Sequence, residues 1–174
     1  VREFEVQGCP ANPLSTWSRL RIVGGFFNTS VPTPGSPIND VWAYIGLRRQ
    51  SDYDDPSGVL RIVGSVFKLL DEDGRIAQGI GYKELGTVRV GRWVTIGIEW
   101  DEVGNRFIFY WGNKSTDIPY DPNKVPDENI AGAPTKGLEV TQRCPNCVEA
   151  RTVASMDAFF DRVYVNQSAV PSGD

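Results

Sequence analysis

The chain has 174 residues, 40% of them hydrophobic, no histidine and a net charge of −4, which fits a single domain over residues 1–174. Without histidine it lacks the commonest general base and the commonest zinc ligand. The acidic balance and the lack of a long basic run argue against nucleic-acid binding, and no apolar run approaches the ~18 residues of a membrane span.

Short segments with the alternation or the β-branched and aromatic content of strands follow one another along the chain. They are Arg2–Val6, Trp17–Asn28, Val41–Arg48, Val59–Leu70, Arg75–Glu84, Leu85–Val90, Trp93–Trp100, Arg106–Trp111, Leu138–Gln142 and Ala154–Asn166. Turns rich in Gly, Pro, Asn and Asp separate them, and Gly74 is placed for a positive φ. We expect Val59–Leu70 to bend or bulge at Gly64, and Gly112–Pro134 to form a long loop. No segment has a helical period, so we predict an all-β fold.

The alternation within Val41–Arg48 predicts which side chains point to the core face of the sheet and which point to the opposite face. Its apolar residues at positions 41, 43, 45 and 47 share one face, so Trp42, Tyr44 and Arg48 share the other. In the segments Trp93–Trp100 and Arg106–Trp111, the same alternation places Glu99 and Tyr110 on the face opposite their apolar neighbours. We also expect Trp93 and Trp111 to lie in the core.

Two further segments carry a family resemblance. The hairpin from Gly91 to Gly112, with GRWVTIGIEWD followed by NRFIFYWG, resembles that of laminin-G-like and concanavalin A-like lectin/glucanase domains. Residues 154–165 (ASMDAFFDRVYV) resemble the closing strand of such domains, and Gly25–Asn28 sits on a matching early strand. The resemblance implies a two-sheet antiparallel β-sandwich with jelly-roll topology. This fold hosts lectins, adhesins, hydrolases and lyases, so it does not select a function.

The three cysteines do not resolve into one arrangement by sequence alone. Cys144 and Cys147 are two residues apart, a spacing found in redox motifs, in half zinc sites and in short disulfide loops. No βαβ pattern surrounds them and no second ligand pair exists, so we favour a disulfide between Cys144 and Cys147. The alternatives are reduced thiols and pairing of Cys9 with either Cys144 or Cys147.

Carboxylates offer little catalytic potential. Glycoside hydrolases that share the resembled fold carry an E-x-D-x-x-E strand, and the nearest match begins at Glu99 and Asp101 but has Gly104 in the third position. We therefore expect Asp101 to cap a turn. Asp157 and Asp161, four residues apart, are a weaker pair, and we assign no catalytic residue.

The resemblance also implies an optional structural Ca²⁺, held by acids such as Glu3 and Asp157 from the first and last strands. The alternative is that acidic turns simply favour Asp. We expect no other cofactor.

Aromatic side chains are the best functional lead, because sugar rings stack on them. Candidates for an open face or rim are Trp42, Tyr44, Tyr53, Tyr82, Trp100 and Tyr110. Alternation along the strands places five residues on faces that point away from the core. We predict that they form the ligand surface: Trp42, Tyr44, Arg48, Glu99 and Tyr110. Aromatics also fill sandwich cores, which is the competing interpretation.

We therefore predict a non-catalytic, lectin-like module that binds carbohydrate and belongs to a secreted, extracellular or periplasmic protein. Its expected partner is a glycan or a cell-surface protein. Two alternatives stay open: a structural or adhesion domain that contacts protein, and an unusual glycoside hydrolase or polysaccharide lyase.

Overall fold

The computed structural model describes residues 4–6, 8, 14–145 and 154–165. All regular elements in these ranges are strands and all their pairings are antiparallel, which confirms the all-β prediction. The strands are β1 (Phe4–Val6), β2 (Trp17–Asn28), β3 (Asp40–Gln50), β4 (Val59–Leu69), β5 (Ala77–Arg89), β6 (Ile96–Asp101), β7 (Arg106–Trp111), β8 (Lys114–Pro119), β9 (Asn129–Ile130), β10 (Lys136–Arg143) and β11 (Ala154–Met156).

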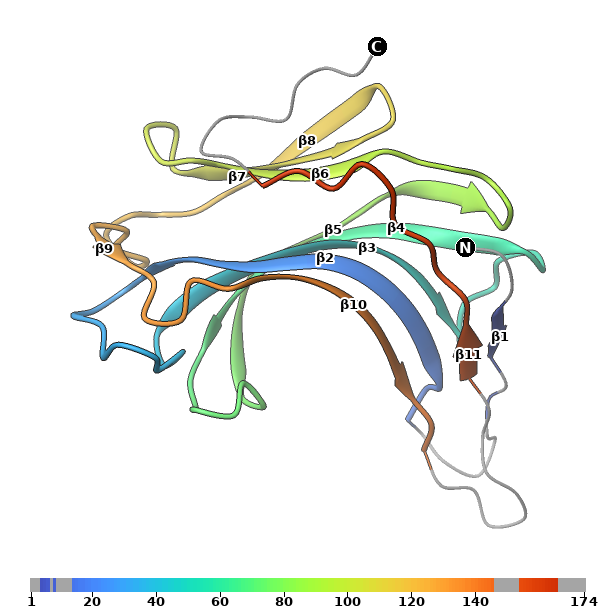
Figure 1. Ribbon diagram of the computed structural model, residues 1–174, viewed down its shortest axis with the longest axis horizontal. Coiled ribbons are helices and arrows are strands. Elements are labelled where there is room, and N and C mark those ends of the chain that lie inside the picture. Colours follow the sequence, from blue (N-terminus) through green and yellow to red (C-terminus); the bar gives the residue numbers. More distant parts are fainter. Residues whose placement is uncertain (1–3, 7, 9–13, 146–153, 166–174) are drawn as a thin grey trace.

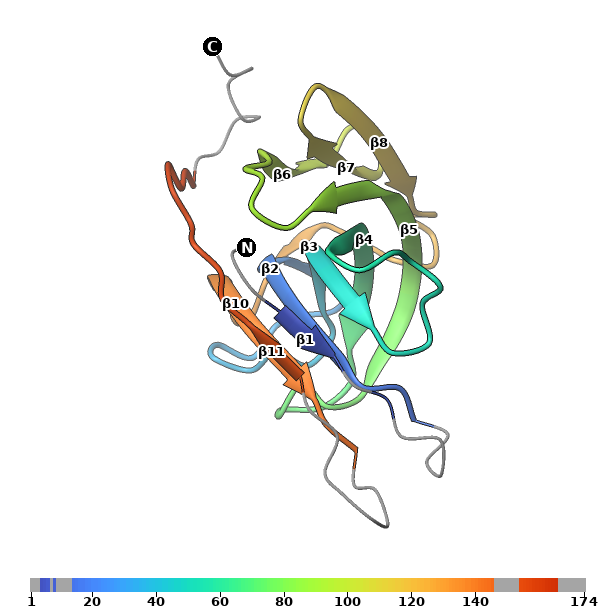
Figure 2. The same cartoon turned by 90° about the vertical axis from the view of Figure 1, so that its right-hand side faces the viewer.

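The strands form a large sheet, a small sheet and a separate pair. The large sheet has the order β10-β2-β3-β4-β5, with β9 pairing to β2, and the small sheet has the order β6-β7-β8. The large sheet arches, and the small sheet lies on its convex side (Figure 1). The β1–β11 pair lies beside β2 and β10 (Figure 2). Among the described strands, none packs on the opposite, concave face of the large sheet.

The main core fills the space between the convex side of the large sheet and the small sheet. The four alternate apolar residues of β3 are buried in it together with Phe107 and Phe109 of β7, so the parity predicted for β3 is confirmed. Phe27 stacks on Trp100 with ring centroids 4.9 Å apart, and Phe26 meets the Phe107 ring edge-on at 5.1 Å. Trp100 was expected at an open face or rim; that expectation is wrong, because its ring packs across to β2.

Gly64 of β4 gives the sheets room to approach. The β4–β5 ladder shifts register on either side of it, between Ile62 and Val63 and between Val66 and Phe67, but the extra residues, Leu85 and Ile80, belong to β5. A bulge of β4 at Gly64 is therefore not found, since β4 pairs with β3 without a register shift there. A Cβ at position 64 would lie 2.9 Å from Cδ1 of Phe109. The missing side chain therefore lets a phenyl ring of the small sheet rest on the backbone of the large one.

Replacing Gly64 with valine should lower the free energy of unfolding by about 1–3 kcal/mol, because the added atoms overpack the core against Phe109. The matched control is Gly79→Val on β5, where an added Cβ meets no atom within 4 Å. Urea denaturation of both variants measures the difference. A Gly64→Val midpoint no lower than that of Gly79→Val would contradict this packing.

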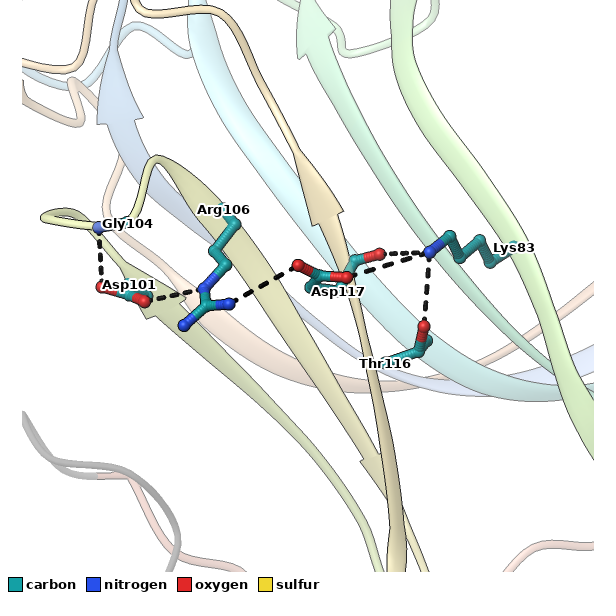
Figure 3. A network of polar contacts seen from close by, with 6 residues as sticks. All are labelled: Lys83, Asp101, Gly104, Arg106, Thr116 and Asp117. Atoms are coloured by element: carbon teal, nitrogen blue, oxygen red, sulfur yellow. Dashed lines mark hydrogen bonds and ion pairs between the residues drawn. The ribbon is translucent and has the colours of Figure 1, made fainter.

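A polar network links the edge strand β5 to the small sheet (Figure 3). Lys83 of β5 donates to the backbone carbonyl oxygen of Asp117 and to Oγ1 of Thr116, both on β8. Arg106 of β7 pairs with Asp101 at 2.8 Å and with Asp117 at 3.6 Å. The backbone N–H of Gly104 and the Arg106 guanidinium hold the pKa of Asp101 below its usual range. Because these groups are accessible to solvent, the network orients the sheet edges more than it stabilises them.

The structure corrects the prediction for the end of the chain. The expected strand Ala154–Asn166 is strand only as β11, which pairs with β1. Beyond it, Arg162 adopts a left-handed φ of 50°, which interrupts an extended conformation. The segment still contributes to the core, because Ala158 and Phe160 pack against it, whereas Phe159 is 54% exposed.

Three other boundaries differ from the sequence predictions. The segments predicted separately at 75–84 and 85–90 form the single strand β5, and the expected long loop from Gly112 contains β8 and β9. Trp93 is 73% exposed instead of buried, because β6 begins only at Ile96 and the indole lies in the irregular segment before it. The positive φ predicted for Gly74 is confirmed at 65°.

Candidate functional site: the concave face

The concave face consists of the side chains that β10, β2, β3, β4 and β5 direct away from the small sheet. Three of the five predicted ligand residues, Trp42, Tyr44 and Arg48, lie here, because they alternate with the core residues of β3. Trp42 and Tyr44 join Val23 and Val63 in a second, smaller apolar cluster on this face. Parity within one strand was enough to place them.

The other two predicted residues, Glu99 and Tyr110, lie on the far side of the molecule. Ile98 of β6 and Phe109 of β7 point into the main core, so their neighbours Glu99 and Tyr110 point outward from the small sheet. Tyr110 donates a hydrogen bond to Glu99, and burial together with this carboxylate raises the tyrosine pKa to about 12. The structure therefore does not bring the five residues together. Alternation along a strand predicts which side chains share a face, but it does not predict which of the two sheets the strand joins.

Tyr44 is less accessible than the sequence suggested. Its side chain is only 7% exposed, and the Phe67 ring lies 6.2 Å away. The guanidinium carbons of Arg19 and Arg21 lie 5.4 and 5.1 Å from its ring centroid. Arginines therefore cover the ring that we expected to stack on a sugar.

A lateral row of arginines crosses the concave face. Arg19 of β2 is the direct cross-strand partner of Arg48 of β3, which is in turn the partner of Arg61 of β4. Thr141 of β10 and Thr87 of β5 close the row at its two ends. We call these three arginines the arginine row. Neighbouring strands lie about 4.8 Å apart, so the row spans roughly 10 Å.

Aromatic rings contact the guanidinium groups of the arginine row. The guanidinium carbon of Arg19 lies 4.5 Å from the Trp17 ring centroid, and that of Arg48 lies 5.6 Å from it. Tyr53, in the turn after β3, lies 3.9 Å from the guanidinium carbon of Arg61. These are distances at which cation–π attraction operates. The rings thus restrict the arginines to a few orientations.

Acidic residues neutralise only part of this face. Arg21 pairs with Glu139 at 2.7 Å, and Arg61 pairs with Asp55 at 2.7 Å and with Glu84 at 2.8 Å. Within the described part of the chain, no ion pair is formed by Arg19, Arg48 or Arg143.

The arginines without ion pairs have neutral contacts. Arg19 donates to Oγ1 of Thr141, and Arg143 donates to the backbone oxygen and the hydroxyl of Ser15. The buried Nε of Arg48 has no hydrogen-bond partner among the described residues. Burial, followed by repulsion from Arg21, lowers the pKa of Arg19 to about 10, so this guanidinium is still cationic at neutral pH.

A shallow depression extends the arginine row toward β5. It has a volume of about 410 Å³ and is lined by Asp55, Arg61, Glu84, Leu85, Gly86 and Thr87. Tyr82 lies on the same strand, and burial, followed by the neighbouring Tyr53, raises its pKa above the usual range. The depression is open to solvent, so an extended ligand could enter from the side of the sheet.

The predicted calcium ligands and the predicted disulfide each include a residue outside the described ranges, so both stay predictions. Asp157 is exposed, whereas Glu3 lies outside the described ranges. No group of three or more potential ligands among Cys, Asp and Glu gathers in the described part of the chain. Cys144 is exposed and free in the structure, and its expected partner Cys147, like Cys9, lies outside the described residues.

The carboxylates weighed for catalysis have structural contacts. Asp101 accepts hydrogen bonds from the Gly104 backbone and from Arg106, which confirms its predicted turn-capping position. Glu99 is hydrogen bonded to Tyr110. Asp161 is exposed and accepts from the backbone N–H of Arg162.

Sequence analysis missed Trp17, Arg19 and Arg61 as site residues. A signal was present, because each of them alternates with core residues on its strand, as Arg48 does. The cross-strand register that aligns them was not visible in the sequence, because it depends on pairing between segments up to 42 residues apart, from Arg19 to Arg61.

No protein-family model, curated protein or solved structure matches this chain. In the described residues, no helix combines the length and the apolar character required to cross a lipid bilayer. We therefore interpret the concave face from its own residues.

Proposed function

We propose that this chain is a non-catalytic carbohydrate-binding module of a secreted or cell-surface protein, and that the concave face of the large sheet is its binding surface. The observation that carries the proposal is the alignment of Arg19, Arg48 and Arg61 beside Trp17 and Tyr53 on a sheet face that the small sheet leaves uncovered. Planar guanidinium groups donate several hydrogen bonds in a fixed geometry, and sugars present many oxygen acceptors.

The finer fold assignment belongs to the same proposal. A concanavalin A-like jelly roll is supported by the arched large sheet packed on a smaller one, and by the hairpin of β6 and β7 whose sequence carries the resemblance. In such a sandwich the concave face is available to a ligand that extends across several strands.

Binding to a panel of soluble polysaccharides tests the proposal, with native affinity electrophoresis as the readout. We expect at least one polysaccharide to retard the chain, and Arg48→Gln to weaken that retardation about tenfold, the effect of losing a charged hydrogen-bond donor. Trp17→Ala should weaken it as well, because the indole against which Arg19 and Arg48 lie is removed.

The small sheet provides matched controls. Glu99→Gln and Tyr110→Phe alter the other half of the surface predicted from sequence, and they should leave binding unchanged. If these two variants abolished binding while Arg48→Gln did not, the binding surface would lie on the small sheet. If no polysaccharide bound the folded chain, the proposal would fail.

A second candidate, a domain that contacts protein, is favoured by one observation. Four apolar side chains of the segment after β11 are about half exposed or more: Phe159, Val163, Tyr164 and Val165. A gathering of exposed apolar groups is typical of a protein contact. This candidate predicts that the chain binds no sugar and that substitutions in this segment weaken partner binding.

A further inference from the structure

The arginine row brings like charges close together, which lowers the stability of the folded sheet. Arg19, Arg48 and Arg61 are direct neighbours across three strands, and like charges opposite one another destabilise a sheet. Only Arg61 of the three has carboxylate partners among the described residues. Arg19 and Arg48 therefore repel each other, and neither forms an ion pair with a carboxylate among the described residues, so an anion bound between them would reduce this cost.

The net charge of the concave face is opposite in sign to the net charge of the whole chain. The chain carries a net charge of −4. In the described structure, six arginines of the large-sheet strands belong to the concave face, against two glutamates on the same strands and Asp55, which pairs with Arg61 from the turn after β3. The arginines are Arg19, Arg21, Arg48, Arg61, Arg89 and Arg143, and the glutamates are Glu84 and Glu139. A positive field on an acidic molecule concentrates anionic ligands at this one face.

The geometry of the arginines suits oxyanions on an extended chain. A guanidinium binds a carboxylate or sulfate group through two parallel hydrogen bonds. Trp17 and Tyr53 hold the guanidinium groups in place, which lowers the entropy lost when a ligand binds. Because the three arginines lie side by side across the strands, a linear polymer with one anionic group per sugar could meet them in succession.

We propose that the ligand of the concave face is an acidic polysaccharide, whose carboxylate or sulfate groups are bound by Arg19, Arg48 and Arg61. This inference rests on the proposed function, because it names the class of glycan that the same face would bind. A neutral glycan would leave the charges of Arg19 and Arg48 uncompensated.

Two matched pairs of polymers test the inference with the unmodified chain. Polygalacturonate is compared with its fully methyl-esterified form, and dextran sulfate with dextran, by isothermal titration calorimetry at two salt concentrations. We expect at least tenfold tighter binding of one acidic polymer than of its neutral counterpart, and weaker binding at the higher salt concentration. The first pair reports on carboxylates and the second on sulfates.

The outcomes separate this inference from the proposed function. If the neutral polymers bound as tightly as the acidic ones, the inference would be overturned while glycan binding survived. If none of the four bound and the wider polysaccharide panel also failed, both would be overturned. Equal affinity for polyglutamate or single-stranded DNA would show a site that recognises charge alone, which would also overturn the inference.

Variants give an independent measurement. Arg48→Gln should weaken binding of the acidic polymer at least tenfold, yet its melting temperature should be equal to or higher than that of the parent chain, because repulsion with Arg19 is removed. The control Arg75→Gln removes the same charge from an exposed turn outside the face and should leave the affinity unchanged. A loss of melting temperature in Arg48→Gln together with unchanged affinity would indicate a purely structural arginine and overturn the inference.

Discussion

Replacing Phe107 with alanine should lower the free energy of unfolding by about 3–5 kcal/mol, the usual cost of removing a fully buried phenyl ring. Phe107 has no exposed surface and projects from the small sheet toward the large one. Its ring lies 5.1 Å from Phe26, 6.1 Å from Phe27 and 6.0 Å from Tyr120, measured between centroids. Alanine would leave a cavity at the contact that joins the two sheets.

Chemical denaturation followed by tryptophan fluorescence measures this loss. The matched control is Phe159→Ala, which removes the same side chain from a position that is 54% exposed, and it should cost much less. Equal losses in the two variants would mean that Phe107 does not join the sheets as described. A protein of this size has about 5–15 kcal/mol of stability in total, so the Phe107→Ala variant should lose a large fraction of it.

Replacing Asp40 with asparagine should lower the free energy of unfolding by about 3 kcal/mol, because a fully buried carboxylate that accepts several hydrogen bonds would lose its charge and one acceptor. Its Oδ1 accepts from Nδ2 of Asn28 and from the backbone N–H of Gly132, and its Oδ2 accepts from the N–H of Ala133. An asparagine amide would direct a donor at one of these donors. The first strands of the large sheet would then lose one of their links to the segment before β10, which also accepts from the Gly25 N–H through the Thr135 carbonyl oxygen.

Hydrogen exchange locates the effect as well as measuring it. Asp40→Asn should lose protection at the amides of Gly132 and Ala133 before global unfolding, since these two amides donate to the carboxylate. Asp73→Asn, at an exposed turn position, makes the same substitution and should be nearly neutral. Unchanged protection at Gly132 and Ala133 in Asp40→Asn would contradict the proposed role.

Local patterns predicted most of the large sheet and failed where they depended on a distant partner. The strands at 17–28 and 41–48 and the hairpin of β6 and β7 were recognised because period-two alternation is a local property. The final strand was overestimated, since residues 157–165 have strand-like composition but find no pairing strand in the described structure. Composition favours an extended chain, but only pairing makes it a strand.

The candidate site shows the same division. Alternation placed Trp42, Tyr44 and Arg48 on one face, and it also placed Glu99 with Tyr110, which are hydrogen bonded. It could not reveal that the two groups belong to different sheets. It also could not reveal that Arg19 and Arg21 cover Tyr44, because cross-strand neighbours are not neighbours in sequence.

The amino-acid sequence alone determined the all-β class and the side of each strand from which Arg19, Arg48 and Arg61 emerge, since both follow from a repeat of two residues. The tertiary structure decided that these three arginines stand next to one another. Strand register is a long-range choice, set by how the apolar faces of β2, β3 and β4 pack together on the small sheet, and a shift of one residue would have sent the charges into the core.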